Sequence, residues 1–157
     1  VMTHPKTLIT LALALSGLLV APAFAQTAAA PSANPATAPA GLYQALGETA
    51  GITRLMDDFV NRLVQDPRIG GHFKEVKPSA LKESLTDQIC QLSGGPCQYE
   101  GADMKSAHAD MDINKGHFNA LVEVLQTAMD AQGIPFAQQN RLLALLAPMH
   151  RDVITVR

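Results

Sequence analysis

The residues most able to take part in chemistry are three side chains, spaced at about one helical turn, that follow a pair of glycines. Met104, His108 and Met111 recur at steps of four and three residues, so a helix would place them on one face. An imidazole between soft, polarisable neighbours suits a flat ligand that is held through its own metal ion. A buried structural histidine fits the same spacing, and one histidine alone cannot make a zinc site.

Four other histidines occur in the sequence. His4 lies in an apolar N-terminal stretch, and we expect His117 and His150 on the solvated surface. His72 precedes Phe73 at a glycine-rich corner, where it can face either the core or solvent. The sequence contains no CxxCH motif, which excludes haem attachment through cysteines by the usual signature.

The two cysteines, Cys90 and Cys97, stand on either side of the Gly94-Gly95 pair. A continuous helix would hold their Cα atoms about 10 Å apart, beyond the separation of about 7 Å that a disulfide can bridge. The glycine pair breaks the helix, however, so the chain can fold back. A disulfide and two reduced, partly buried thiols therefore both remain open.

Composition sets limits on the class of protein. The 157 residues carry a formal net charge of −2 and no basic stripe, so nothing favours binding to nucleic acid. The chain has five phenylalanines and no tryptophan, which is little aromatic bulk for a small helical domain. A cofactor is a natural candidate to fill its centre.

The N-terminal part reads as a leader and a linker. Residues 1–25 contain the apolar run LITLALALSGLLVAPAF and a small-x-small ending, Ala23-Phe24-Ala25, typical of a cleaved signal peptide. We expect an exported protein, periplasmic or extracellular, with no stable membrane insertion after cleavage; an uncleaved anchor is the alternative. Residues 26–40, rich in alanine and proline, are expected to form a disordered linker, which leaves 41–157 as the folded domain.

The folded part shows helical periodicity throughout, with no alternating strand pattern, and predicts an all-α domain. One helix should end at Asp66-Pro67, and Ser79 should cap the next, which runs to the Gly94-Gly95 pair. Asn114 should cap a third helix, closed by Gly133. Pro135 opens the last helix, and Pro148 should kink it.

Several stretches resemble the group I truncated haemoglobins. They are GGPCQYEGADMKSAH (residues 94–108), LYQALGETAGI near the start of the domain, DDFVNRLVQDPRIGGHF after it, and LLALLAPMHRDV near the end. The resemblance spans residues 42–154. It implies a truncated globin fold, a two-over-two helical sandwich around non-covalent haem b, with His108 as the ligand of the iron. Neutral imidazole suits both ferrous and ferric iron.

The resemblance also assigns the residues around the haem. Phe73 matches the phenylalanine that stacks on the porphyrin at the corner. The side where a gas binds is called the distal side, and the resemblance places Leu81, Leu85 and Ile89 there. The side of His108 is called the proximal side, and the resemblance places there Met104, Ile113, Phe118, Leu121 and Leu125.

Two positions depart from the family pattern. The first glycine hinge reads Gly47 and Gly51 where an adjacent pair is usual, and we expect a small local adjustment. On the distal side, the family often has a tyrosine and a glutamine that bond to dioxygen, and this chain has Val60 and Leu85. Bound dioxygen carries partial negative charge, so the loss of these donors predicts weak dioxygen binding.

The function implied is reversible binding of dioxygen, nitric oxide or carbon monoxide by a haem protein that an unidentified reductant keeps ferrous. We expect a ligand-binding protein more than an enzyme. The alternatives are a haem-dependent redox enzyme, such as a nitric oxide dioxygenase or peroxide reductase, and a cofactor-free helical interaction module. Fold alone does not choose between them.

Overall fold

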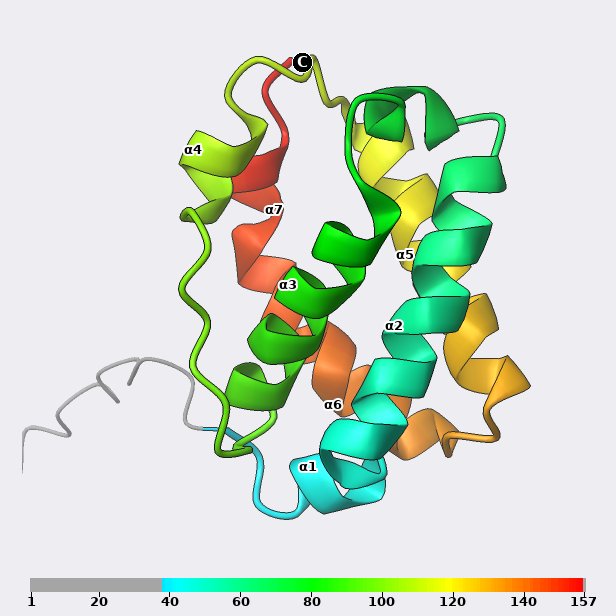
Figure 1. The fold of residues 1–157 in the computed structure, drawn as a ribbon, viewed down its shortest axis with the longest axis vertical. Helices are drawn as coiled ribbons and strands as arrows, with labels where there is room; N and C mark the ends of the chain where they lie inside the picture. The colour runs from blue at the N-terminus through cyan, green and yellow to red at the C-terminus, as the bar shows by residue number, and fades with distance from the viewer. Residues whose placement is uncertain (1–37, 157) are drawn as a thin grey trace, which may run out of the picture. The chain divides into compact units, whose positions relative to one another are not determined.

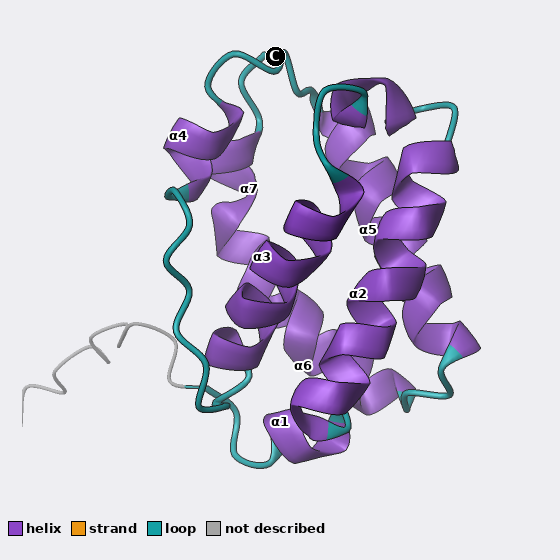
Figure 2. Ribbon diagram, in the orientation of Figure 1, coloured by secondary structure: helices purple, strands orange, loops and turns teal. Residues whose placement is uncertain are grey.

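The computed structural model describes residues 38–156, and every regular element among them is helical (Figures 1 and 2). The predicted leader 1–25 and residues 26–37 of the predicted linker lie outside this range. No helix in the described range is long and apolar enough to cross a membrane. In chain order the helices are α1 (Leu42–Ala45), α2 (Glu48–Gln65), the 3-10 turn η1 (Gly70–Phe73), α3 (Pro78–Leu92), α4 (Met104–His108), α5 (Lys115–Ala131), α6 (Phe136–Leu146), the 3-10 turn η2 (Ala147–Met149) and α7 (His150–Val153).

The helices form two layers, as Figure 1 shows, with α2 and α3 in front of α5 and α6. Helix α2 is the centre of the packing and contacts both α3 and α5. Its apolar stripe is almost fully buried, and each such side chain contributes roughly 1.5–3 kcal/mol to folding. The stripe consists of Ile52, Leu55, Met56, Phe59, Val60 and Leu63.

The helix boundaries confirm most of the sequence predictions and correct one. Asp66 ends α2, and Asn114 caps α5 by accepting the backbone N–H of His117 at 2.9 Å. Pro148 falls in the η2 turn that separates α6 from α7, as predicted. Ser79 is not a cap: α3 begins one residue earlier, at Pro78, because proline suits the first turn of a helix, where its missing N–H has no partner to lose.

The first hinge needs both of its glycines although they are not adjacent. Gly47 precedes α2 with φ of 82°, in the left-handed region that glycine tolerates. Gly51, four residues on, lies against the backbone of the preceding turn, where a Cβ would sit 2.1 Å from the carbonyl oxygen of Leu46. The hinge therefore joins α1 to α2 at a sharp angle with the backbones in contact.

The second hinge brings the two cysteines together. After α3 ends at Leu92, Gly94 takes φ of 91° and the N–H of Gly95 bonds back to the carbonyl of Cys90 at 2.8 Å. The fold-back places the Cα atoms of Cys90 and Cys97 5.7 Å apart, and their sulfurs form a disulfide. The disulfide, one of the two open alternatives, thus attaches the end of α3 to the start of the segment that leads to α4.

Candidate functional site

Helix α4 fixes the ring orientation of His108. The Nδ1 atom of His108 lies 2.7 Å from the backbone carbonyl oxygen of Met104. A carbonyl can only accept, so Nδ1 carries a proton, and in the neutral tautomer Nε2 is then the nitrogen with a free lone pair. The side chain is half-buried. The bond to Met104 therefore leaves Nε2 as the ring nitrogen of His108 that can bind a metal ion.

The start of this short helix is held by Asp103. Its carboxylate accepts the backbone N–H of Ser106 at 2.9 Å and the Ser106 hydroxyl at 2.7 Å. The backbone bond first, and the hydroxyl second, lower the pKa of Asp103 below its ordinary value. A carboxylate that stays ionised at the N-terminus of a helix also interacts favourably with the helix dipole.

A largely apolar pocket of about 40 Å³ adjoins His108. It lies between α4, η1, α5 and α7, elements that Figure 1 shows surrounding one end of the domain. Its lining residues are Ile69, His72, Phe73, His108, Met111, Ile113, His117, Phe118, Leu121 and Val153. Five of the predicted haem contacts are in this set: Phe73, His108, Ile113, Phe118 and Leu121.

The other five predicted contacts lie away from that lining. Leu81 and Leu85 are half-buried on α3, and Met104 is half-buried on α4. Ile89 and Leu125 are 3% and 2% exposed and belong to the hydrophobic core.

Three histidines that the sequence left on the surface or undecided take defined places. His72 and His117 line the pocket, with their ring centroids 4.6 Å apart in an edge-to-face contact. His150 packs edge-on against Phe118 at 5.6 Å. The expectation of solvated surface positions for His117 and His150 was wrong, because each ring is half-buried against another ring.

The orientation of the His117 ring at the start of α5 has a recognisable signal in the sequence. Its Nδ1 accepts the backbone N–H of Asn114 at 3.3 Å while Asn114 caps His117 in return, which makes a capping box. The spacing of a cap residue and a side-chain acceptor three positions on is visible in the sequence. Ile69 and Val153, which also line the pocket, had no comparable signal.

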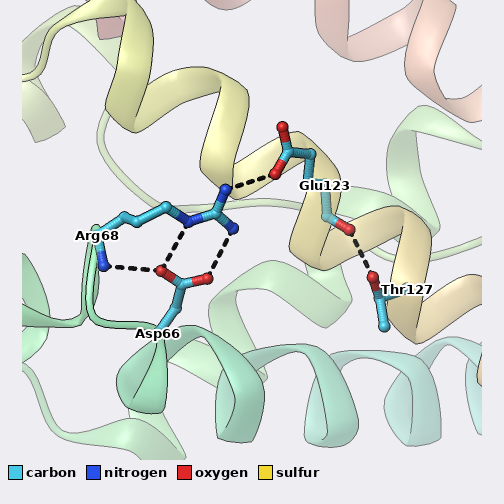
Figure 3. Close-up of polar contacts among 4 residues, drawn as sticks. All are labelled: Asp66, Arg68, Glu123 and Thr127. Carbon is cyan, nitrogen blue, oxygen red and sulfur yellow. Dashed lines mark hydrogen bonds and ion pairs between the residues drawn. The ribbon is translucent and has the colours of Figure 1, made fainter.

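The corner that carries His72 and Phe73 is held by Arg68 (Figure 3). The guanidinium of Arg68 donates to both carboxylate oxygens of Asp66, at 3.1 and 2.8 Å, and reaches Glu123 on α5. The Arg68 side chain holds the pKa of Asp66 below its ordinary value, and the two carboxylates raise the pKa of Arg68. This network links the end of α2 to α5 beside the pocket.

The distal positions are apolar in the structure, as the sequence indicates. Phe59 and Val60 are 4% and 0% exposed. On α3, the hydroxyl of Thr86 donates to the carbonyl of Lys82 within its own helix at 2.8 Å. Gln88, also on α3, is polar, but its side chain is buried and turned toward α4.

The burial pattern fits a large flat ligand such as haem. Apolar side chains that a small domain would normally cover stay only half-buried on η1, α3, α4 and α5, and α4 has no buried residue. A porphyrin would cover such surfaces, and the free Nε2 of His108 supplies the donor that its iron needs. The half-buried members of the predicted haem contacts are Phe73, Leu81, Leu85, Met104, His108, Phe118 and Leu121.

Comparison with known proteins decides the family. The profile of the family described as bacterial-like globin matches residues 41–155. A group 1 truncated haemoglobin of Synechocystis sp. is 31% identical over 119 residues, which cover 72% of this chain and 96% of the relative. This chain belongs to the group 1 truncated haemoglobins.

Other relatives and solved structures agree with this membership. A group 1 truncated haemoglobin of Mycolicibacterium paratuberculosis is 27% identical over 74% of this chain and 86% of its own length. The truncated haemoglobin of Tetrahymena pyriformis in its Fe(III) form superposes with a TM-score of 0.70 at 26% identity, over 72% of this chain and 97% of the other. The 2/2 haemoglobin of Synechococcus sp., at 21% identity and a TM-score of 0.69 over 73% and 98%, supports the fold.

The truncated haemoglobin fold of this chain is thus the two-over-two arrangement that the resemblance implied. Haem is the cofactor of the family, in the b form usual for globins, and its members bind diatomic gases. Within that frame, His108 with its bond to Met104 is the arrangement in this truncated haemoglobin that can hold the iron.

Proposed function

We propose that this truncated haemoglobin is a haem b protein that binds dioxygen and other diatomic gases reversibly, with His108 as the protein's ligand to the iron. The observation that carries the proposal is the 2.7 Å bond from Nδ1 of His108 to the Met104 carbonyl, beside an apolar pocket. That bond fixes the tautomer in which Nε2 can coordinate.

Different residues of the chain would serve different parts of this function. Bound haem would supply an iron atom that can bind a gas. His108 would hold that iron through Nε2, and Phe73 and Phe118 would provide apolar surface for the ring. Val60 and Leu85 offer no hydrogen-bond donor to a gas, so dioxygen, which is polar when bound, loses more stabilisation than carbon monoxide.

One set of absorption spectra tests the proposal. The purified protein, supplied with haem, should show ferric, ferrous and ferrous carbon monoxide spectra of a haem with one histidine ligand. His108→Ala should lose most of the pigment, and His72→Ala, which removes an imidazole from the same pocket, should keep it. Equal spectra for the wild type and His108→Ala would overturn the proposal.

We also propose that the protein is exported to the periplasm or beyond the cell. Support comes from the leader-like residues 1–25 and from the bonded cysteine pair, because disulfides persist mainly in oxidising compartments. The mass of the protein recovered from its native host should correspond to a chain that begins at Gln26 and has no free thiol. A full-length chain with two free thiols would contradict export.

A further inference from the structure

Gln88 has an unusual position for an amide side chain. It lies on α3, is 8% exposed, and its Nε2 donates to the Sδ atom of Met104 on α4 at 3.6 Å. Burying a primary amide costs free energy unless its donors find partners, and a thioether sulfur is a weak acceptor. A leucine would fill such a position at lower cost if only packing mattered.

Both the side chain and the backbone of Met104 accept a hydrogen bond. Its sulfur accepts from Gln88, and its backbone carbonyl accepts from Nδ1 of His108. The three residues therefore form a continuous path from α3 to the imidazole. The path crosses between two helices that are separate in the ribbon of Figure 1.

Helix α4 needs such an external support. It has five residues, and no residue in it is buried. A helix of this length is not stable by itself, because nucleation costs more than a few hydrogen bonds return. Its orientation must come from contacts with its neighbours, which include α7 as well as α3.

We propose that Gln88 is a positioning residue for His108 that acts through Met104. The inference rests on the proposed function, since it assigns His108 to the iron. The amide of Gln88 fixes the Met104 side chain, and with it the carbonyl that sets the direction and tautomer of the imidazole. Groups that orient a metal-bound histidine commonly change metal affinity by roughly 10- to 100-fold when they are lost.

The test uses variants of matched size. Gln88→Leu removes the amide, and Met104→Leu removes the sulfur but keeps the volume and the backbone carbonyl. The double variant tests whether the two act together. Thr86→Val is the control, because Thr86 is also buried on α3 but bonds only within that helix.

Three measurements separate positioning from simple stability. They are hydrogen exchange of the segment 102–111 in the haem-free protein, the iron–histidine stretching band of the ferrous protein, and the rate of haem transfer to an acceptor protein. We expect Gln88→Leu to speed exchange, shift the band, and speed haem loss roughly two- to tenfold, the range for one hydrogen bond. Met104→Leu and the double variant should give similar values, and Thr86→Val should match the wild type.

The outcomes are distinguishable. If Gln88→Leu behaves like Thr86→Val in all three measurements, or if the effects of Gln88→Leu and Met104→Leu simply add, the positioning role is wrong. If the wild type takes up haem normally in that case, the proposed function still stands. A wild type that shows no haem band would instead overturn the proposed function, and this inference with it.

Discussion

At the scale of single residues, the site combines one nitrogen atom that can bind a metal ion with distal positions, Val60 and Leu85, whose side chains carry no hydrogen-bond donor. His108 has its tautomer fixed by Met104, whereas Val60 is fully buried with only carbon atoms to present. If His108 binds the iron as proposed, retention of the cofactor and discrimination among gases should depend on different residues. A substitution on the distal side should change the second property and leave the first intact.

Val60→Tyr tests this separation. A tyrosine hydroxyl at this position would supply the hydrogen-bond donor that Val60 lacks, and a hydrogen bond to a strongly polarised group contributes roughly 1.5–3 kcal/mol. We expect dioxygen release to slow by about ten- to a hundredfold, measured by stopped-flow displacement with carbon monoxide. Carbon monoxide release should change much less.

The control for this change is Val60→Phe. It introduces the same ring into the buried position and therefore shares any cost of overpacking. Equal dioxygen release from the tyrosine and phenylalanine variants would mean that the hydroxyl does not reach the gas, and the apolar distal side would then not explain the binding behaviour.

At the scale of elements, two glycine hinges and the charged corner at Arg68 determine how neighbouring helices are placed. The first hinge depends on Gly51, because a Cβ there would meet the Leu46 carbonyl oxygen at 2.1 Å. A backbone atom cannot move aside as a flexible side chain can. The close contact between the end of α1 and the start of α2 therefore requires glycine at position 51.

We expect Gly51→Ala to lower the free energy of unfolding by about 2–3 kcal/mol, the range for a forced backbone shift. Urea unfolding followed by circular dichroism measures the change. Gly71→Ala is the matched control, because a Cβ at Gly71 meets no atom within 4 Å. If the two alanine variants were equally stable, the close contact at the hinge would have to relax at no cost.

The corner beside the pocket should respond to acid. The pKa of Asp66 lies below its ordinary value of 3.8 because Arg68 bonds to its carboxylate. A depressed pKa in the folded state means that the contribution to stability is present above 3.8 and is lost as the pH falls through the folded-state value. Both groups are near the surface, so solvent screens the interaction and the contribution is small.

An NMR titration of the Asp66 carboxyl carbon measures this effect. The midpoint should lie below 3.8 in the wild type and return toward 3.8 in Arg68→Gln. Arg62→Gln is the control, because Arg62 pairs with Asp58 and not with Asp66. A wild-type midpoint at or above 3.8 would contradict the role given to Arg68.

Helical periodicity was enough to predict most of these elements. The stripe on α2, the break at Asp66-Pro67 and the cap at Asn114 are local features, and local physics determines them. The start of α3 was missed by two residues, because a cap at Ser79 would start the helix at Ala80 and α3 begins at Pro78, where proline suits the first position. The cysteine pairing stayed open because it depends on how the chain folds back after Gly94, which spacing does not reveal.

The site could be predicted only where it depends on residue type. His108 stood out by its spacing and by the family resemblance, but its bond to Met104 and the place of Gln88 come from packing between α3 and α4. The same holds for His72 and His117. His117 looks like a surface histidine by itself and His72 could face either the core or solvent, and both line the pocket because η1 and the start of α5 meet there.

At the scale of the whole molecule, haem should behave as a missing part of the core. Apolar residues predicted to contact haem, such as Leu81, Leu85 and Phe118, are only half-buried, although the domain has few bulky side chains. Covering them removes apolar area from water, and each square ångström contributes about 25 cal/mol. Much of the stability of the functional protein should therefore come from the cofactor.

Thermal unfolding with and without haem tests this dependence. A ligand that binds only the folded state stabilises it by about 4 kcal/mol at a thousandfold excess over its dissociation constant. The wild type should gain several degrees in its melting midpoint on addition of haem. His108→Ala should melt near the wild type without haem, because the His108 side chain is not part of the buried core, and should gain far less with it. If both proteins gained equally, the porphyrin ring alone would account for the stabilisation, and the bond from His108 to the iron would contribute nothing measurable to holding the molecule together.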